Sequence, residues 1–298
     1  MPLYWPAFEF SYKLDMSRLL PYIAAIEGGK AAGSMSIVPP QWRGGAAASE
    51  IPDSPSAVAV PQATPVSQIQ ERKLRLLVNN DSPAYEWVKQ RFLAGSAPMS
   101  LEDILKMHCM VAEEAGTRYH AVGALRAEGF HVIVGERGIG FHVGAPSRKL
   151  PRLMGQYIQF LYSEPLRSMP AAIHSLVAHF FFATIHPFGD GNGRVARLVS
   201  AAILFQRGYN GHGFYANFNY FYQNETRYHK ILYEAQSLYR EPIVFEITEF
   251  VAFGLEGLAF ELQGINSFLK IKMHRAVKKQ PLPESRMDDP RRFAVQGV

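Results

Sequence analysis

The sequence predicts a mainly α-helical protein, a helical bundle that carries one small β-hairpin. Apolar residues recur at helical spacing through most of residues 67–264, and one stretch, 129–144, instead has two β-favouring runs around a glycine-containing turn. Residues 31–66 are rich in Ala, Gly, Ser and Pro. We therefore expect an N-terminal helical segment (1–30), a linker (31–66), a main domain (67–264) and a basic C-terminal extension (265–298).

The N-terminal segment is expected to form a short helix from Met16 to Glu27, because its apolar residues recur every three or four positions. Gly28 follows where a helix would be capped, and Pro21 favours a later start. The stretch 31–66 cannot bury enough apolar surface to order as part of a core, which is why it is interpreted as a linker.

Helices are expected to fill most of the main domain. Their apolar patterns run over Gln68–Val78, Ala84–Leu93, Leu101–Glu114, Leu150–Tyr162, Pro170–His186, Arg194–Arg207, Gln223–Leu238 and Pro242–Phe268. The hairpin at 129–144 would be marginal alone, so it must pack on the helices or await a partner strand. An exposed strand edge there could also receive an extended peptide.

The composition is that of a soluble globular chain, since 48% of its 298 residues are hydrophobic and 19% are charged. Its longest apolar runs, such as Leu198–Phe205, are far shorter than the roughly 18 residues of a membrane span. The N-terminus lacks the pattern of a secretory signal, so the cytosol is the expected compartment. The single cysteine, Cys109, excludes an internal disulfide and is interpreted as a small buried side chain.

The net charge of +5 is modest for this length, apart from a basic C-terminal stretch from Lys270 to Arg292. That stretch could contact nucleic acid or an acidic surface. A solvated tail is the favoured interpretation, and neither nucleic acid nor a membrane is an expected partner.

The most informative segment is IHPFGDGNGRVAR, residues 185–197, which joins two apolar helices through a glycine-rich loop. The first helix delivers His186 at its C-terminal end. Gly191, Asn192 and Gly193 open the second helix, where backbone N–H groups lack partners within the helix. Such an end attracts anions, and glycine lets the main chain approach phosphate oxygens closely.

Four side chains around this loop point to phosphate chemistry. Arg194 and Arg197 share one face of the first helical turn, where cations oppose the helix dipole unless an anion is bound. Asp190 is a carboxylate of the kind that holds Mg²⁺ beside a polyphosphate, and His186 could take a proton from an attacking hydroxyl. Each alone has an ordinary structural explanation, but together they share none. Phe188 is interpreted as an anchor of the loop in the core.

HPFGDGNGRVAR resembles the signature of Fic domains, His-x-Phe-x-Asp/Glu-Gly-Asn-Gly-Arg-x-x-Arg, and every specified position matches. The resemblance extends over about residues 67–264. It implies a Fic-type helical bundle in which the hairpin is a flap beside the active-site loop. It also implies transfer of AMP from ATP to a Ser, Thr or Tyr hydroxyl of a target protein, with release of pyrophosphate.

The resemblance also implies roles for individual residues. His186 would be the general base on the target hydroxyl, and Asp190 would hold the Mg²⁺ that bridges the α- and β-phosphates. The hairpin 129–144 would dock the target protein. The nucleotide phosphates would be bound by Gly191, Asn192 and Gly193, with Arg194 at the β-phosphate and Arg197 at the γ-phosphate.

Alternatives to AMP transfer remain open. Relatives of the Doc branch, which phosphorylate a protein, have Lys where this chain has Gly193, which favours AMP transfer here. Other possibilities are an enzyme that uses another nucleotide or removes AMP, and a catalytically silent nucleotide-binding regulatory module. The sequence does not disclose the target protein, and it leaves open whether the protein modifies itself or forms a homodimer.

Many relatives restrain themselves with an inhibitory motif, Ser/Thr-x-x-x-Glu-Gly/Asn, whose glutamate pairs with the arginine that matches Arg197. Glu27 has the Glu-Gly ending, but Ile23 occupies the Ser/Thr position. The segment Ser67–Glu71 has the spacing but is followed by Arg72. If Glu27 docks on Arg197, we expect Glu27→Gly to raise activity. The alternative is that Glu27 only decorates a packing helix.

Overall fold

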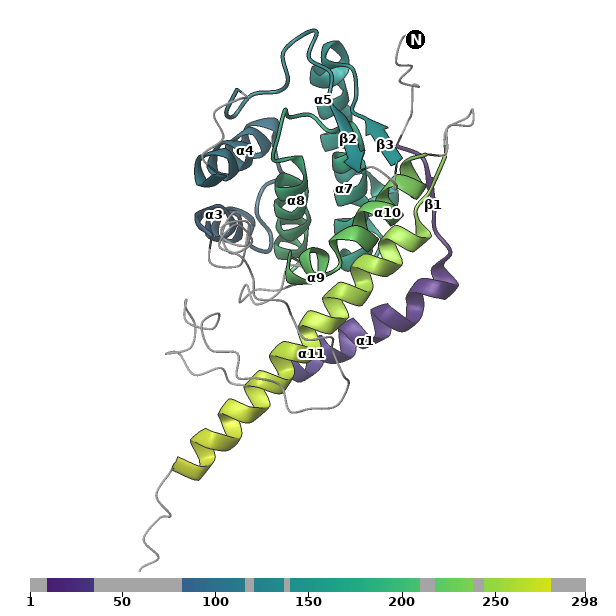
Figure 1. Ribbon diagram of the computed structural model, residues 1–298. Helices are drawn as coiled ribbons and strands as arrows, with labels where there is room; N and C mark the ends of the chain where they lie inside the picture. The colour runs from purple at the N-terminus through teal and green to yellow at the C-terminus, as the bar shows by residue number, and fades with distance from the viewer. Residues whose placement is uncertain are drawn as a thin grey trace, which may run out of the picture.

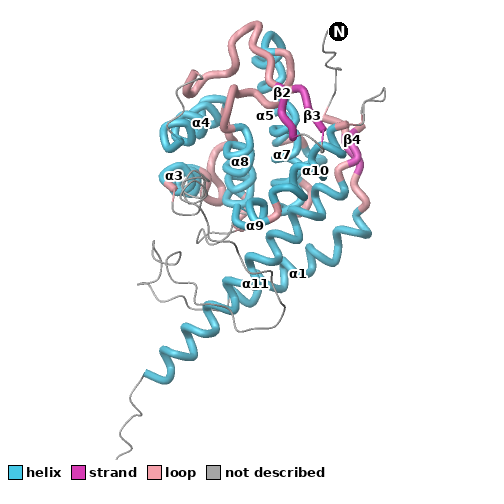
Figure 2. Tube along the Cα trace, viewed as in Figure 1, coloured by secondary structure: helices cyan, strands magenta, loops and turns pink. Residues whose placement is uncertain are grey.

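The computed structural model describes residues 10–34, 82–115, 121–136, 140–209, 218–237 and 244–279. Helices dominate these residues, and the strands form two small two-stranded sheets (Figures 1 and 2). The prediction of a mainly α fold is confirmed. The expected helix Gln68–Val78 and most of the expected linker lie outside the described residues.

The centre of the fold is a pair of packed helices, α7 (Ala171–Ile185) and α8 (Asn192–Gln206). Every residue of α7 is buried, as expected for a helix that is apolar on all sides. The loop between the two helices, residues 186–191, is the glycine-rich segment of the signature. The candidate site is therefore built directly on the most deeply buried helices of the protein.

Further helices surround this pair. Helices α3 (Pro83–Arg91) and α4 (Leu101–Ala115) pack on α8, whereas α5 (Leu150–Leu161) and the short α6 (Glu164–Arg167) pack on α7. A single 3₁₀ turn, η2 (Ser147–Lys149), leads into α5. Helix α3 begins with an N-cap, because Ser82 Oγ accepts a hydrogen bond from the Tyr85 N–H at 3.1 Å.

The C-terminal helices cover the other side of α7. Helices α9 (Phe218–Gln223) and α10 (Glu225–Gln236) lie beside the long helix α11 (Thr248–Lys279), which also packs on α7. Gly254 makes that contact close, since a Cβ atom there would lie 2.2 Å from Cδ2 of Leu176. A larger residue at 254 would require the Leu176 side chain or the helix itself to shift.

The N-terminal segment joins the same region. Helix α1 (Met16–Ser34) lies along α11, and strand β1 (Tyr12–Lys13) pairs in parallel with β4 (Phe245–Glu246) just before α11 (Figure 1). The Thr248 hydroxyl accepts a hydrogen bond from the Asp15 N–H at 2.8 Å. These contacts connect the two ends of the described chain.

Several helix boundaries differ from the predictions. Helix α1 accommodates Pro21 within its first turns and runs past Glu27 and Gly28 to Ser34, because packing along α11 compensates for the missing N–H and the flexible glycines. Helix α11 starts at Thr248 rather than Pro242 and continues through residues 265–279, which were expected to be extension. Cys109 is only half-buried, and its thiol donates to Glu113 at 3.3 Å.

The predicted hairpin is present as strands β2 (Ile133–Glu136) and β3 (Gly140–Val143), paired antiparallel with Val134 opposite His142. Strand β3 contacts α10, and Val134 of β2 lines a cavity together with the start of α8 (Figure 2). The His142 ring fixes the hairpin there, because Nε2–H donates to the Thr184 carbonyl of α7 at 2.8 Å.

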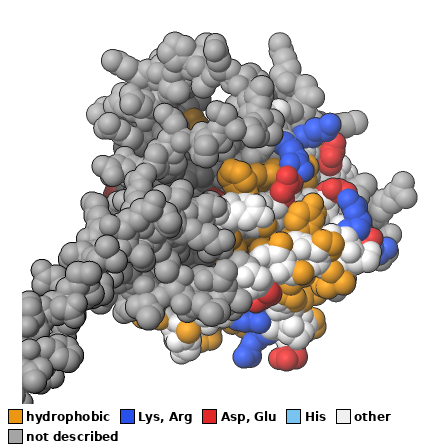
Figure 3. All heavy atoms as spheres, turned by 90° about the horizontal axis from the view of Figure 1, so that it is seen from below, with side chains coloured by type: hydrophobic (Ala, Val, Ile, Leu, Met, Phe, Trp, Pro, Cys, Tyr) orange, Lys and Arg blue, Asp and Glu red, His pale blue; other side chains and the backbone are white. Residues whose placement is uncertain are grey.

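The described helices and one face of the molecule can be checked for membrane-spanning length and for charge. No helix within the described ranges combines the length and the apolar content that a membrane crossing requires. Figure 3 views the molecule from below, and the coloured part of that face mixes hydrophobic, acidic and basic side chains. That part of the surface therefore presents no patch of a single charge.

Candidate active site

His186 ends helix α7 in a left-handed conformation, with φ 53° and ψ 60°, and its N–H donates to the Phe182 carbonyl at 3.0 Å. Among the described residues, only His186 and Phe10 have positive φ without being glycine. This conformation costs about 1–2 kcal/mol for such a residue, and strain of this kind is frequent at functional sites. The turn leads the chain into the signature loop and leaves the His186 ring at a cavity wall.

The protonation of the His186 ring follows from its surroundings. The Ala183 carbonyl lies 3.3 Å from Nδ1, and because a carbonyl only accepts, Nδ1 carries the hydrogen. Nε2 is then left with a lone pair. Burial lowers the pKa of His186 well below its ordinary value, and the neighbouring His142 lowers it further. His186 is therefore a neutral imidazole with an accepting nitrogen at neutral pH.

The Asn192 side chain fixes the conformation of the signature loop by bonding to its backbone. Its Oδ1 accepts from the Phe188 N–H and its Nδ2 donates to the Phe188 carbonyl, both at 2.9 Å. The side chain is buried. This arrangement differs from the expected phosphate contact, because the side-chain amide of Asn192 is hydrogen-bonded to the backbone of the loop itself.

Phe188 and His108 anchor the loop on its buried side. The Phe188 side chain is fully buried, and its ring stacks on His108 with centroids 3.8 Å apart. His108 accepts the Gly123 N–H at Nδ1 (3.1 Å), so its Nε2–H donates to the Asp190 carbonyl at 3.2 Å. His108 could not be predicted as a site residue, because its position on α4 gives no local signal.

The N-terminus of α8 presents backbone N–H groups to the open side of the loop. Gly191 is the N-cap, with φ 77°, a conformation that favours glycine, and α8 has neither a side-chain cap nor an acidic residue in its first turn. Gly191, Asn192 and Gly193 all line the cavity in front of the loop. The geometry suits an anion.

The two signature arginines have different surroundings. Arg194 donates to the Val111 carbonyl at 3.0 Å and lies 3.7 Å from the Asp190 carboxylate, so it connects α8 to α4 and to the loop. Arg197 lies deeper, where burial lowers the pKa of its guanidinium and the nearby Tyr228 partly opposes that effect. A guanidinium nevertheless remains charged at neutral pH, which gives the site a partly buried cation.

Asp190 lies at the open end of the loop, with about half of its side chain exposed. One oxygen accepts the Gly191 N–H at 2.6 Å, and the other is 3.7 Å from Arg194. Within the described part of the chain, no cluster of three metal-ligating side chains occurs. Asp190 thus fits an ion such as Mg²⁺, which takes one protein carboxylate and fills its other positions with phosphate oxygens and water.

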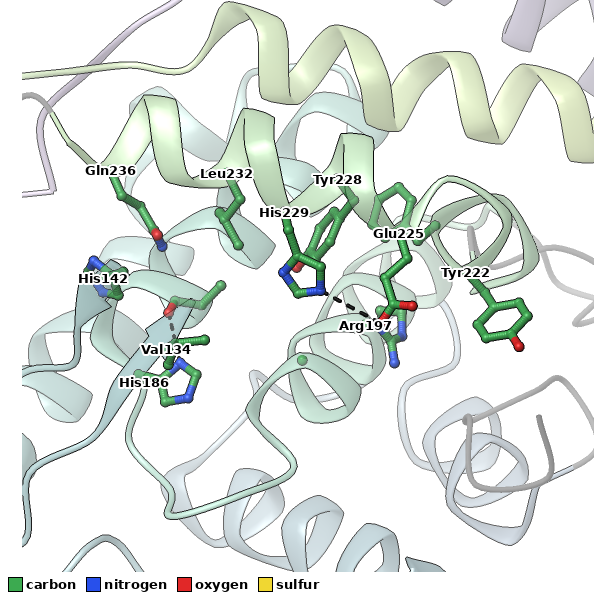
Figure 4. A pocket seen from close by; sticks show the side chains of 13 residues that line it. Val134, His142, His186, Arg197, Tyr222, Glu225, Tyr228, His229, Leu232 and Gln236 are labelled. Atoms are coloured by element: carbon green, nitrogen blue, oxygen red, sulfur yellow. Dashed lines mark hydrogen bonds and ion pairs between the residues drawn. The ribbon is translucent and has the colours of Figure 1, made fainter. Parts of the chain in front are cut away.

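Two joined cavities meet at these residues. The first, here called the loop cavity, has a volume of about 460 Å³ and lies between the signature loop and strand β2. The second, here called the helix cavity, has a volume of about 170 Å³ and extends toward α9 and α10 (Figure 4). The two cavities share Val134, His186, Gly193 and Arg197.

The residues that form the far wall of the helix cavity were not among those predicted from the sequence. Figure 4 shows side chains of α10 facing His186 and Arg197, with the His229–Glu225 pair (3.7 Å) closest to Arg197. This wall combines aromatic, apolar and amide side chains, as organic ligand sites do. It consists of Phe221, Tyr222, Glu225, Tyr228, His229, Leu232 and Gln236.

A buried polar pair supports this wall. His179 Nε2 and Tyr228 Oη are hydrogen-bonded at 2.9 Å between α7 and α10. Burial lowers the pKa of His179 to about 3 and raises the pKa of Tyr228 to about 12, so both are neutral at neutral pH. The pair therefore adds no charge beside Arg197.

The buried histidines predict how stability changes with pH. Burial lowers the pKa of His142 and His174 to about 4 and that of His179 to about 3, against about 6.5 in the unfolded chain. The unfolded state thus binds more protons below pH 6.5, and stability must fall as pH falls. Between pH 7 and 5.5, we expect each to remove about 1 kcal/mol from the free energy of unfolding.

Urea unfolding at both pH values tests this expectation. His179→Gln should lose about 1 kcal/mol less than wild type between pH 7 and 5.5, whereas His131→Gln, a control at an exposed position, should lose as much as wild type. Equal losses in the two variants would contradict the assignment to His179.

Arg126 joins the hairpin to the signature loop. Its buried guanidinium donates to three backbone carbonyls: His186 at 2.9 Å, Phe130 at 2.8 Å and Ala145 at 2.6 Å. Its own N–H donates to the Pro187 carbonyl at 3.0 Å. Both ends of the hairpin are thereby fixed relative to His186. A lone arginine before a glycine-rich stretch gives no sequence signal for this role.

Glu27, the candidate inhibitory residue, is found elsewhere. Its carboxylate accepts a hydrogen bond from the Tyr209 hydroxyl, just beyond the C-terminal end of α8. Arg197 lies in the N-terminal half of the same helix, roughly 15 Å away at 1.5 Å per residue. The structure therefore does not bring Glu27 to Arg197. The other candidate, Ser67–Glu71, lies outside the described residues.

Comparison with known proteins agrees with the signature. Residues 98–204 match the model of the Fic/DOC family. The chain is 29% identical over 126 residues to a protein adenylyltransferase Fic of Nematostella vectensis, an alignment that covers 42% of this chain and 27% of the relative. It is 38% identical over 71 residues to a protein adenylyltransferase Fic of Drosophila ananassae, covering 24% of this chain and 14% of the relative.

The fold is also shared with a solved structure. A crystal structure of a Fic family protein from Desulfovibrio desulfuricans G20 superposes with a TM-score of 0.54 at 17% identity, covering 94% of this chain and 79% of that one. At this identity, the similarity concerns the fold alone. The chain spans about a quarter or less of the length of the two curated relatives.

Proposed function

We propose that this chain, whose residues 98–204 match the Fic/DOC family, is a protein adenylyltransferase, which moves AMP from ATP to a hydroxyl of a target protein. The observation that carries this proposal is the meeting of a neutral imidazole, a helix N-terminus and a partly buried guanidinium at two joined cavities. Gly193, where Doc-type relatives have Lys, favours transfer of AMP over transfer of phosphate.

ATP would bind across the two cavities. Its phosphates would lie on the N–H groups at the start of α8, with Arg194 and Arg197 offsetting their negative charge. Its nucleoside would occupy the helix cavity, where Tyr222 and Leu232 offer apolar surface and Gln236 an amide. The two hydrogen bonds between the Asn192 side chain and the Phe188 backbone would keep the loop in the conformation that binds the phosphates.

Asp190 would hold Mg²⁺ on the solvent side of the phosphates. The ion, when bound, would stabilise negative charge on the pyrophosphate leaving group. Arg194 would contribute to the same end, because it lies 3.7 Å from Asp190 and is already aligned by Val111.

The chemical step would use His186 as the base. The hydroxyl oxygen of the target attacks the α-phosphorus, the bond from that phosphorus to the bridging oxygen breaks, and its electron pair leaves with pyrophosphate. The hydroxyl proton passes to His186 Nε2, which is available because Nδ1 is committed to Ala183. Preorganised charge around the phosphates would supply most of the remaining acceleration.

Mass spectrometry tests the transferred group directly. The purified protein and a cell lysate are incubated with Mg²⁺ and one nucleotide at a time, and modified peptides are identified by their added mass. An added AMP that depends on ATP supports the proposal. An added phosphate, an added UMP or GMP, or loss of a pre-existing AMP would replace it with another Fic-type activity.

Glu27→Gly should leave the rate of transfer within about twofold of wild type. The reason is that Glu27 contacts Tyr209 and not Arg197. The substitution should lower stability by about 1 kcal/mol, chiefly because glycine is unfavourable within a helix. The measurement is labelling with ATP at matched concentrations of folded protein, with Glu27→Gln as the variant that keeps helix propensity. A rise of several-fold in both variants would restore Glu27 as an inhibitory residue.

A further inference from the structure

The outer face of the hairpin exposes two large apolar side chains. Ile133 is 57% exposed and Phe141 is 60% exposed. The register pairs Ile133 with Val143, so Phe141, two residues earlier on β3, lies on the same face as Ile133. The opposite face carries Val134 and His142, which line the helix cavity. The hairpin thus has an inner face toward the site and an apolar outer face.

The free edge of β2 has a defined hydrogen-bonding pattern. The Gly144 N–H donates to the Val132 carbonyl at 3.0 Å, which makes 132 and 144 a hydrogen-bonded pair in this antiparallel register. Pairs alternate along the ladder, so Ile133 and Gly135 direct their N–H and C=O groups away from β3. Within the described residues, the sheet contains no third strand to use them.

This edge of β2 lies directly in front of the signature loop. Val132, Ile133 and Val134 line the loop cavity together with His186 and the start of α8. An extended segment paired with β2 would therefore alternate its side chains between the two faces of the hairpin. A side chain beside Val134 would point toward the cavity that holds His186. Of the two side chains that flank it, one would lie beside Ile133 and the other beside Gly135, which is paired with Phe141 on the same face.

From this geometry we infer that the protein selects target segments in which an apolar residue directly precedes or follows the acceptor hydroxyl. The inference rests on the proposed function and concerns the choice of its protein substrate. The occupant of the outer face is the flanking apolar side chain of that segment, paired across strands with Ile133. A charged flanking residue would not make this apolar contact, and it would place a charge over Ile133 and Phe141. Both effects should lower kcat/KM, by about tenfold in total.

A peptide library tests the inference. Synthetic peptides with a fixed central Ser, Thr or Tyr and random neighbours are incubated with Mg²⁺ and ATP, and the modified members are sequenced by mass spectrometry. Three proteins are compared: wild type, Ile133→Glu, and Leu93→Glu. The last is a matched control, because Leu93 is similarly exposed (53%) but follows α3, away from the hairpin.

For wild type and Leu93→Glu, we expect Val, Ile, Leu or Phe beside the acceptor to be enriched about tenfold over Asp, Glu and Lys. For Ile133→Glu, this enrichment should disappear and Lys or Arg should replace it. Modified peptides without apolar enrichment, or the same pattern in Ile133→Glu as in wild type, would overturn the inference. So would labelling of lysate proteins but of no peptide, because an extended segment would then not be recognised. Absence of transfer to any acceptor would instead contradict the proposed function.

Discussion

Replacing His186 with Asn should lower the rate of AMP transfer by roughly 10² to 10⁴ while leaving the affinity for ATP nearly unchanged. In the proposed mechanism the imidazole would act only on the attacking hydroxyl, through Nε2, whereas the α8 N-terminus and the arginines would bind the phosphates. Asn is chosen because it tolerates the left-handed backbone of position 186, with φ 53°. Transfer is measured with labelled ATP, and binding by calorimetry.

His186→Ala serves as the comparison variant. Alanine also removes the base, but it fits the left-handed conformation poorly, so it should be less stable than the Asn variant by about 1 kcal/mol. Equal loss of transfer in both variants would separate the chemical role from the structural one. Near-normal transfer in the Asn variant would show that the proton goes elsewhere.

The pH dependence of wild type provides an independent check. A base must be unprotonated, so activity falls only as pH falls through the pKa of the base. Because burial lowers the pKa of His186, the acidic limb of kcat/KM should lie below pH 6.5, the ordinary histidine value. An acidic limb above pH 7 would be inconsistent with the environment of this imidazole.

The central helices could be predicted because their signals are local. Helix α7 is mostly apolar, and the glycines of the signature loop follow it. Both its residue range and its end at His186 could therefore be predicted. Strands β1 and β4 could not be found in this way. Each has two residues, and their pairing depends on contacts between Tyr12 and Phe245, far apart in the chain.

The same distinction holds within the site. The loop residues follow one another in sequence, so their joint chemistry could be recognised from spacing. Arg126 and His108 act on the loop from other elements, through backbone carbonyls that have no sequence signature. The role of Asn192 also depended on geometry, because the residue type alone does not reveal that its amide closes onto Phe188.

Replacing Asp190 with Asn should remove activation by Mg²⁺ together with most of the transfer activity. The carboxylate is the protein ligand we propose for the ion, and an amide oxygen without charge binds it far more weakly. Asn keeps an oxygen that can accept the Gly191 N–H, which Asp190 now accepts at 2.6 Å. The loop should therefore keep its shape, and ATP binding in the absence of metal should change little.

Magnesium titrations of transfer by wild type, Asp190→Asn and Glu225→Gln decide the assignment. Glu225 is the matched control, because it is the other carboxylate that lines these cavities and lies on the side of α10, away from the loop. The Glu225 variant should keep the wild-type midpoint for Mg²⁺, whatever its rate. If the midpoint moved in Glu225→Gln and stayed in place in Asp190→Asn, the ion would lie on the α10 side of Arg197, and the leaving pyrophosphate would have to point there as well.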